Sequence, residues 1–201
     1  GGEALTDLNF SVPRGTVFGI IGGTGAGKSS VVNLIPCFYE PTAGSVLVDG
    51  LDTRRWDRSA LRGRIGMVAQ KAVLFRGTIR ENLLWGKEDA TDAELQIALE
   101  TSQAAEFVST REGGLNAAVA QGGKNLSGGQ RQRLTIARAV VREPEILILD
   151  DSASALDYAT DAKLRKALRT LKDTTVFIVS QRTSSIRFAD QILVLDDGHA
   201  V

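Results

Sequence analysis

The fold of this chain is decided by the stretch Gly22-Gly23-Thr24-Gly25-Ala26-Gly27-Lys28-Ser29-Ser30. An apolar run at 17–21 precedes it and predicts a β-strand, and the run at 31–35 that follows predicts a helix. A strand, the pattern G-x-x-x-x-G-K-S and a helix together form a phosphate-binding loop. The glycines let backbone N–H groups turn against phosphate oxygens, and the helix N-terminus attracts the same anion. The sequence therefore predicts a site for a nucleoside triphosphate.

Two side chains of this loop have specific roles in the prediction. Lys28 supplies a positive charge for the β- and γ-phosphates, and the Ser29 hydroxyl can bind Mg²⁺. The alternative interpretation is a glycine-rich turn that only joins a strand to a helix, but it leaves the Lys-Ser pair in register unexplained. The residues expected to bind the nucleotide are Gly22, Thr24, Gly25, Ala26, Gly27, Lys28, Ser29 and Ser30.

The composition argues against several other classes of protein. The 201 residues carry 24 Lys+Arg and 24 Asp+Glu, so the charge balance gives no sign of a nucleic-acid or anionic-membrane surface. Cys37 is the only cysteine, which rules out an internal disulfide and fits a reducing compartment. No apolar run approaches the ~18–20 residues of a membrane span. Because the chain opens without Met and stops just after a turn, we expect a domain excised from a longer chain.

The order of the apolar runs predicts an α/β protein. Alternating apolar and polar residues at 8–12 indicate a half-buried strand, and the run at 146–149 is typical of a parallel strand covered on both faces. Capping-box spacing at Thr91 and Ser127 predicts two helix starts. The other strands are expected at 45–48, 65–68, 175–179 and 191–195.

These elements define the expected architecture. We expect a single domain with an α/β core of the phosphate-loop (P-loop) NTPase type at about 1–70 and 144–201. Its mixed, largely parallel sheet is flanked by helices and has an antiparallel β edge at the N-terminus. A helical subdomain at about 71–143 is inserted into this core.

An acidic residue ends one of the predicted strands. Asp150 follows the apolar run 146–149, and in phosphate-loop proteins the strand adjacent to the loop delivers such an Asp to Mg²⁺. An apolar run with an Asp is weak evidence alone, but the phosphate loop upstream supplies the context. We therefore expect Asp150 to bind Mg²⁺ together with Ser29.

A second motif, Leu126-Ser127-Gly128-Gly129-Gln130, decides the family. It is a helix N-terminus with two glycines and a hydroxyl, which can cradle an anion, although an ordinary capped helix start has the same features. Together with Gln70 and the run Ser154-Ala155-Leu156-Asp157, it makes nearly the whole chain resemble the nucleotide-binding domain of an ATP-binding cassette (ABC) transporter. The resemblance implies ATP and Mg²⁺ as cofactors and Gln70 as a catalytic residue and Mg²⁺ ligand. It also implies that ATP contacts Ser127, Gly128, Gly129 and Gln130.

The stretch 70–83 resembles exporters with fused membrane and nucleotide domains, especially bacterial multidrug half-transporters. In such proteins this region meets the coupling helices of the membrane domain, although plain core packing explains Leu74 and Phe75 equally well. The resemblance implies an N-terminal membrane domain, a place at the cytoplasmic face of the inner membrane and a second nucleotide-binding domain as partner. In this family two such domains sandwich two ATPs. Each ATP lies between the phosphate loop of one domain and the motif at 126–130, called the signature, of the other.

Two positions depart from the family pattern. The general base of the family is a Glu directly after the Asp150 position, but here it is Asp151, whose carboxylate lies about 1.5 Å further back. The switch residue of the family is a His, but here it is Gln181, which can hydrogen-bond a γ-phosphate and cannot carry a positive charge. We hypothesise a site that holds ATP and hydrolyses it slowly, while the intact signature completes a competent site on a partner. The chain would then be the degenerate-site half of a heterodimeric exporter.

Three other interpretations stay open. Asp is still a carboxylate, so both changes could be conservative in a symmetric, fully active homodimeric ATPase. Non-transport cassette proteins of DNA repair, chromosome maintenance or translation tend to carry long insertions or basic surfaces. The arginines after the signature fit a solvated helix face better than nucleic acid; they are Arg131, Arg133, Arg138 and Arg142. A regulatory ATP sensor without a transport role would not require the intact signature.

Overall fold

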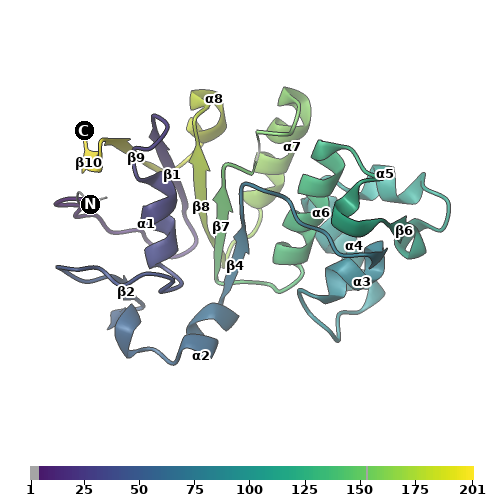
Figure 1. Ribbon diagram of the computed structural model, residues 1–201, viewed down its shortest axis with the longest axis horizontal. Helices are drawn as coiled ribbons and strands as arrows, with labels where there is room; N and C mark the ends of the chain where they lie inside the picture. Colours follow the sequence, from purple (N-terminus) through teal and green to yellow (C-terminus); the bar gives the residue numbers. More distant parts are fainter. Residues whose placement is uncertain (1–4, 153) are drawn as a thin grey trace.

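A computed structural model describes residues 5–152 and 154–201, so residues 1–4 of the predicted core lie outside the described part. Six strands form one sheet in the order β10-β9-β1-β8-β7-β4 (Figure 1). They are β1 (Val17–Gly22), β4 (Ile65–Val68), β7 (Ile146–Asp150), β8 (Thr175–Ser180), β9 (Gln191–Asp196) and β10 (His199–Ala200). Every neighbouring pair is parallel except β9 and β10. The predicted α/β fold with a mixed, largely parallel sheet is therefore confirmed.

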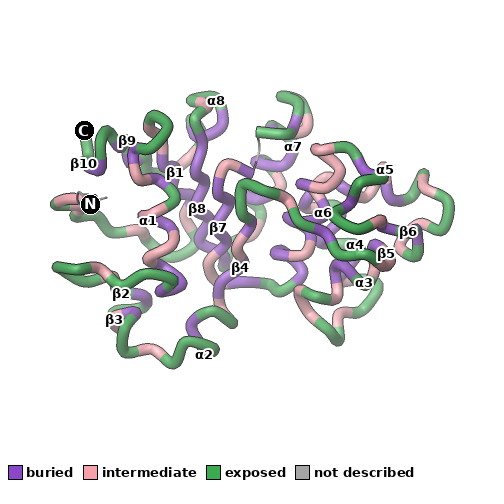
Figure 2. Tube along the Cα trace, viewed as in Figure 1, coloured by how far each residue is buried: buried purple, intermediate pink, exposed green. Residues whose placement is uncertain are grey.

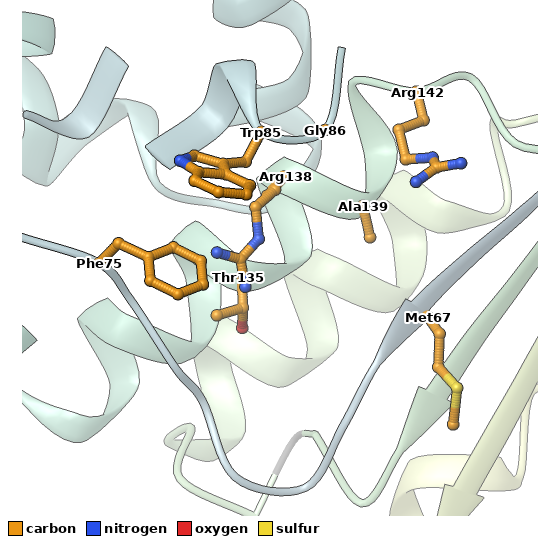
Figure 3. Close-up of a pocket in the computed structure, with 8 residues that line it drawn as sticks. All are labelled: Met67, Phe75, Trp85, Gly86, Thr135, Arg138, Ala139 and Arg142. Atoms are coloured by element: carbon orange, nitrogen blue, oxygen red, sulfur yellow. The ribbon is translucent and has the colours of Figure 1, made fainter. Parts of the chain in front are cut away.

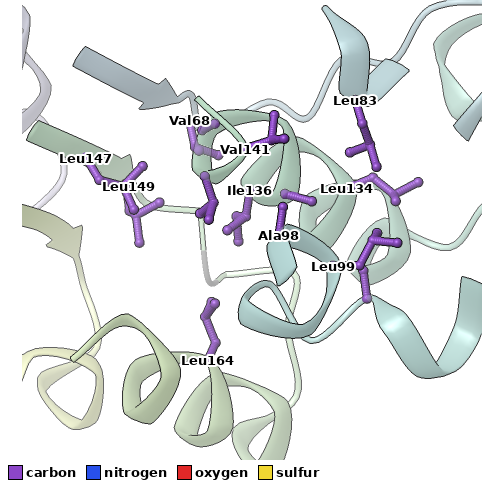
Figure 4. Packing of buried hydrophobic residues seen from close by; sticks show 14 of the residues in the cluster. Val68, Leu83, Ala98, Leu99, Leu134, Ile136, Val141, Leu147, Leu149 and Leu164 are labelled. Atoms are coloured by element: carbon purple, nitrogen blue, oxygen red, sulfur yellow. The ribbon is translucent and has the colours of Figure 1, made fainter. Parts of the chain in front are cut away.

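Helices cover both faces of this sheet because its central strands are apolar along their length. On one face, Val31 of α1 (Lys28–Leu34) packs in a cluster with Phe18 of β1. The other face carries α6 (Gly128–Val140), α7 (Tyr158–Leu168) and α8 (Thr183–Ile186). Figure 4 shows Ile136 of α6 and Leu164 of α7 in one cluster with Leu149 of β7. Figure 2 accordingly shows burial along β7 and β8, where every residue of β8 and all of β7 except Ile146 are buried.

The chain between β4 and β7 is mostly helical. It forms α3 (Ile79–Leu84), α4 (Asp92–Thr101), α5 (Ala105–Ser109) and α6, and two 3₁₀ turns at Gly114–Asn116 and Gln121–Gly123. The short strands β5 (Gly77–Thr78) and β6 (Ala118–Val119) pair antiparallel. Capping boxes begin α3 at Thr78, α4 at Thr91 and α6 at Ser127, so both predicted helix starts are confirmed. Because α6 packs on α3, α4 and β4, it joins this helical region to the sheet.

The strand expected at 8–12 is not formed, so the prediction of an antiparallel edge at the N-terminus is wrong. The alternation is present, since Leu8 and Val12 pack against the core and Phe10 stacks on Phe18 with ring centroids 5.1 Å apart. No strand of the described residues pairs with this segment, however. A separate antiparallel hairpin is formed by β2 (Leu47–Val48) and β3 (Leu51–Asp52). A 3₁₀ turn (Thr53–Arg55) and α2 (Arg58–Gly63) then lead into β4.

Candidate nucleotide-binding site

The phosphate loop joins β1 to α1, as its sequence predicts. Gly25 and Gly27 adopt φ values of 83° and 94°, in the left-handed region that glycine tolerates best. Gly27 is the N-cap of α1, and no side chain caps this helix, so its first N–H groups remain available to an anion. Gly22 is required for another reason, because a Cβ atom there would lie 2.3 Å from the Leu195 carbonyl oxygen.

The Lys28 ammonium group is held at the start of the loop. Lys28 is buried, and its Nζ donates to the carbonyl oxygens of Gly22 at 2.9 Å and Gly23 at 2.6 Å. These two carbonyl oxygens hold the positive charge of Lys28 beside the loop. The position fits a point charge directed at a bound phosphoryl group.

Asp150 meets Ser29 at the end of β7. The Ser29 hydroxyl donates to Asp150 Oδ1 at 3.0 Å. Burial raises the pKa of the Asp150 carboxyl, the Ser29 hydrogen bond lowers it, and the adjacent Asp151 charge raises it again. In the sheet, β7 is not a neighbour of the phosphate-loop strand, because β8 lies between β1 and β7. Asp150 still reaches Ser29 because α1 packs across the sheet onto β7 and β8.

The Ser29 and Asp150 oxygens fit a Mg²⁺ site. An octahedral Mg²⁺ with bonds of about 2.1 Å places neighbouring ligand oxygens about 3 Å apart, which is the separation found here. No group of three or more His, Cys, Asp or Glu side chains suited to a metal occurs among the described residues. Mg²⁺ in nucleotide sites needs only one or two carboxylates, because substrate phosphates and water complete its coordination. Mg²⁺ bound there would neutralise phosphate charge.

Asp151 lies beside Gln70, at the ends of the adjacent strands β7 and β4. Gln70 Nε2 donates to Asp151 Oδ2 at 3.1 Å, and the Asp151 N–H donates to the Val179 carbonyl at 3.0 Å. Asp151 has a left-handed φ of 45°, which is unusual for a residue with a side chain. Gln181 follows β8, the other neighbour of β7, and is exposed. The sequence-predicted residues Gln70, Asp150, Asp151 and Gln181 therefore gather at one edge of the sheet.

The signature residues lie at the start of α6, away from the phosphate loop. Ser127 accepts a hydrogen bond from the Gln130 N–H, and Gln130 Oε1 accepts one from the Ser127 N–H, so the expected capping geometry is present. This end of α6 belongs to the part of the molecule beyond β4, whereas the phosphate loop follows β1 (Figure 1). Strands β8 and β7 separate the two. Within one chain the signature therefore does not lie beside the phosphate loop.

A groove of about 170 Å³ opens between α3 and α6. Figure 3 shows its lining, where Phe75 and Trp85 stack with centroids 4.9 Å apart and the Arg138 guanidinium lies 5.7 Å from the Phe75 ring. Both rings are exposed, whereas Leu74 is buried in the core. Plain core packing therefore explains Leu74 but not Phe75, which is exposed. Arg138 Nη1 is buried and has no hydrogen-bond partner in the described structure.

Sequence reasoning assigned no role to Arg182, which follows Gln181. Its guanidinium donates to the carbonyl oxygens of Ser154 and Leu156, in the loop that joins β7 to α7. The available signal was an arginine directly after the switch position, but a sequence cannot tell which distant carbonyls such a side chain reaches.

The comparisons with known proteins agree with this geometry. A family model described as ABC transporter matches residues 5–154. The chain belongs to the ABC transporter family. It is 45% identical over 199 residues to the beta-(1-->2)glucan export ATP-binding/permease protein NdvA of Rhodopseudomonas palustris (strain BisB5), a match that covers 98% of this chain and 33% of that protein. It is 44% identical over 200 residues to the uncharacterized ABC transporter ATP-binding protein YfiB of Bacillus subtilis (strain 168), covering 99% and 35%.

A solved structure gives the same result for the fold. A bacterial Atm1-family ABC exporter with ATP bound matches with a TM-score of 0.94 and 37% identity, covering 100% of this chain and 35% of that one. The chain is thus an ABC nucleotide-binding domain of the exporter type, and its family supports ATP binding and hydrolysis. It spans about a third of the length of these ABC relatives. Among the described residues, no helix is both long and apolar enough to cross a membrane.

Proposed function

We propose that this ABC domain binds Mg-ATP and powers an exporter by ATP-driven dimerisation with a second nucleotide-binding domain. The observation that carries the proposal is the pairing of Ser29 with Asp150 beside the loop that holds Lys28. These groups can hold the triphosphate and its Mg²⁺ on one chain. The signature, beyond β4, is then free to cover a nucleotide held by the partner. Thr24, Ala26 and Ser30 complete the proposed phosphate contacts.

Hydrolysis at the chain's own site is expected to be slow. Asp151 has a shorter side chain than the Glu of the family pattern, and its Oδ2 accepts a hydrogen bond from Gln70. Gln181 supplies no positive charge. A misplaced general base typically costs 10²–10⁴-fold in rate, or roughly 3–5 kcal/mol of barrier. The partner would therefore be a different, catalytically competent subunit whose site is completed by this chain's Ser127, Gly128, Gly129 and Gln130.

The longer protein is proposed to carry a membrane domain N-terminal to this chain, which places this domain at the cytoplasmic face of the inner membrane. The groove with Phe75 and Trp85 suits the coupling helices of that domain, because it exposes two stacked rings beside an unpartnered Arg138 donor. Aromatic and arginine side chains are typical anchors of protein interfaces. In this proposal the helical subdomain (71–143) receives the membrane domain and the core (1–70 and 144–201) holds ATP. No nucleic-acid partner is proposed.

The test is a paired measurement of ATP binding and ATP turnover on this chain, unmodified and with Asp151→Glu plus Gln181→His. We expect tight ATP binding in both, turnover barely above background in the unmodified chain, and a rise of at least about tenfold in the double variant. The single variant Gln181→His is the control, because it shows whether a charge added at position 181 raises ATP turnover without the change at Asp151. Turnover of about 1 s⁻¹ or faster in the unmodified chain would contradict the slow-site proposal.

A symmetric, fully active homodimer is the second candidate. It is favoured by the contact between Gln70 and Asp151, which shows the shorter carboxylate reaching a neighbouring site residue at 3.1 Å. The same assay separates the two candidates, because a working Asp151 base predicts fast turnover without any substitution.

A further inference from the structure

The Arg182 side chain is hydrogen-bonded to residues 154 and 156, in the loop segment before α7. Its Nη2 donates to the Ser154 carbonyl at 3.1 Å, and its Nη1 donates to the Leu156 carbonyl at 3.4 Å. The Tyr158 ring lies 5.4 Å from the Arg182 Cζ atom. A planar guanidinium presents its donors as a rigid fork, so it fixes two carbonyls relative to each other in a way that a flexible ammonium cannot.

Both ends of the Arg182 link are anchored. The Arg182 N–H donates to the buried Ser180 Oγ at 3.0 Å, which ties the residue to the end of β8. Beyond Leu156, the Asp157 side chain accepts a hydrogen bond from the Thr160 N–H at 2.9 Å and caps α7. The loop is therefore held between two regular elements, with the guanidinium as the bridge to β8.

The same loop lies on the signature end of α6. A Cβ atom at Gly129 would lie 3.1 Å from the Ala155 carbonyl oxygen, and one at Gly128 would lie 3.9 Å from the Ala155 Cβ. The Leu156 side chain, buried in the shared core, would lie 3.6 Å from the same Gly129 position. Residue contacts thus run without a gap from the end of β8, through Arg182 and the loop, to the first turn of α6.

We propose that Arg182 is a positioning residue that couples Gln181, at the chain's own ATP site, to the signature, which serves the partner's site. The inference rests on the proposed function, since it requires the signature to act on a second chain. A displacement of Gln181 moves the Arg182 backbone with it, and the guanidinium carries the two loop carbonyls along. Ala155 then shifts against Gly128 and Gly129. Occupancy of the slow site is in this way transmitted to the competent one.

The test compares Arg182→Met and Arg182→Lys with a matched control, Arg187→Met. Arg187 also lies over a ring, with its Cζ atom 5.1 Å from the Phe188 centroid, but it has no carbonyl partner in the part of the chain that the structure describes. Three quantities are measured: ATP affinity at low protein concentration, the ATP-dependent self-association constant, and amide hydrogen exchange. The exchange readout is taken without ATP as well.

For Arg182→Met we expect ATP affinity within twofold of the unmodified chain and self-association weakened about tenfold or more, because the Ser154 and Leu156 carbonyls are no longer held and Ala155 is no longer fixed against the signature. Amides of 128–131 and 154–157 should exchange faster while the rest of the sheet does not. Arg182→Lys should fall between Met and the unmodified chain, and Arg187→Met should change nothing.

Unchanged exchange at 128–131 in Arg182→Met would overturn the coupling. A uniform rise in exchange with a lower Tm would also overturn it, since that result describes a residue needed only for the fold. Failure of the proposed function looks different, because the unmodified chain would then bind no ATP or would not self-associate. In that case the ATP-free exchange at 128–131 still decides the role of Arg182.

Discussion

The two helix N-termini that the proposed function uses, those of α1 and α6, are built in opposite ways. α1 begins at Gly27 with no side-chain cap, and Lys28 folds back over the loop carbonyls. α6 begins at Ser127 with a reciprocal capping box that involves Gln130. The first N–H groups of α1 therefore remain unsatisfied and favour an anion, whereas those of α6 are partly satisfied by the chain itself.

This difference has a functional consequence. An uncapped helix start beside Lys28 and the Ser29–Asp150 pair is suited to hold a triphosphate on one chain. A capped helix start already has part of its N–H groups satisfied, and in the proposed function it meets a nucleotide that another chain holds. The comparison predicts that substitutions at the α1 end change ATP affinity, while substitutions at the α6 end change association and stability.

The largest effect is expected at the α1 end. Replacing Lys28 with Ala should weaken ATP binding roughly 100-fold, because a charge-assisted contact of about 3 kcal/mol is lost. Isothermal titration calorimetry measures this change. Lys71→Ala, at an exposed lysine, is the control and should bind ATP normally. Equal ATP affinity in the Lys28 and Lys71 variants would contradict the assignment of ATP binding to the start of α1.

At the α6 end, Gly128→Asp should leave ATP affinity unchanged and weaken ATP-dependent self-association about tenfold, or by about 1.4 kcal/mol. The structure accommodates a Cβ atom at Gly128, which would lie 3.9 Å from the Ala155 Cβ. An acid in the first turn suits the helix dipole but repels a partner's phosphates. Sedimentation with and without ATP measures the change. A loss of ATP affinity in the separated chain would contradict the assignment of the signature to the partner's site.

Removing the N-cap of α6 tests whether this helix start contributes to the stability of the fold. Ser127→Ala should lower the free energy of unfolding by about 1 kcal/mol, since one N-cap hydrogen bond is lost. Urea unfolding measures it, with Ser109→Ala as the control at an exposed helix serine. If the control costs as much as the cap, the capping interaction does not stabilise α6 as proposed.

The smallest effect on stability is expected at Asp150. Its pKa is raised by burial, so the ionised carboxylate destabilises the folded state above that pKa, and the penalty disappears as pH falls below the unfolded value near 3.8. Asp150→Asn should therefore raise the unfolding free energy at neutral pH by about 0.5–1 kcal/mol and less at acidic pH. The variant should also lose Mg²⁺-dependent ATP binding. Urea unfolding of both forms at several pH values measures the difference in unfolding free energy. A stabilisation by Asp150→Asn that grows as the pH falls would contradict the prediction.

The sequence predicted the sheet and the helix starts because both depend on local patterns. The apolar runs at β7 and β8 became buried parallel strands, and Thr91 and Ser127 began helices through capping boxes. The strand expected at 8–12 failed because alternation predicts which side chains are buried and not whether a partner edge is available. The place of β8 between β1 and β7 was not predicted, because strand order depends on the packing of the whole domain.

The sequence predicted which residues belong to the candidate site, but it did not predict the contacts between them. Motif spacing brought Ser29 and Asp150 together correctly, but it gave no sign that Gln70 would donate to Asp151. It also gave no role to Arg182, whose partners are carbonyl oxygens 26 and 28 residues away. Side chain to backbone bonds of this kind carry no sequence signature, because every residue offers the same carbonyl.

The most direct test of the central claim mixes two forms of this chain. One is unmodified; the other carries Asp151→Glu and Gln181→His for a competent site, plus Gly128→Asp to disable its signature. Because the competent site would face a working signature only in the mixed dimer, we expect ATP turnover of the mixture to exceed the sum of the separate forms at least about tenfold. Turnover equal to that sum, or fast turnover by the unmodified chain alone, would contradict a slow site paired with a signature that acts on its partner.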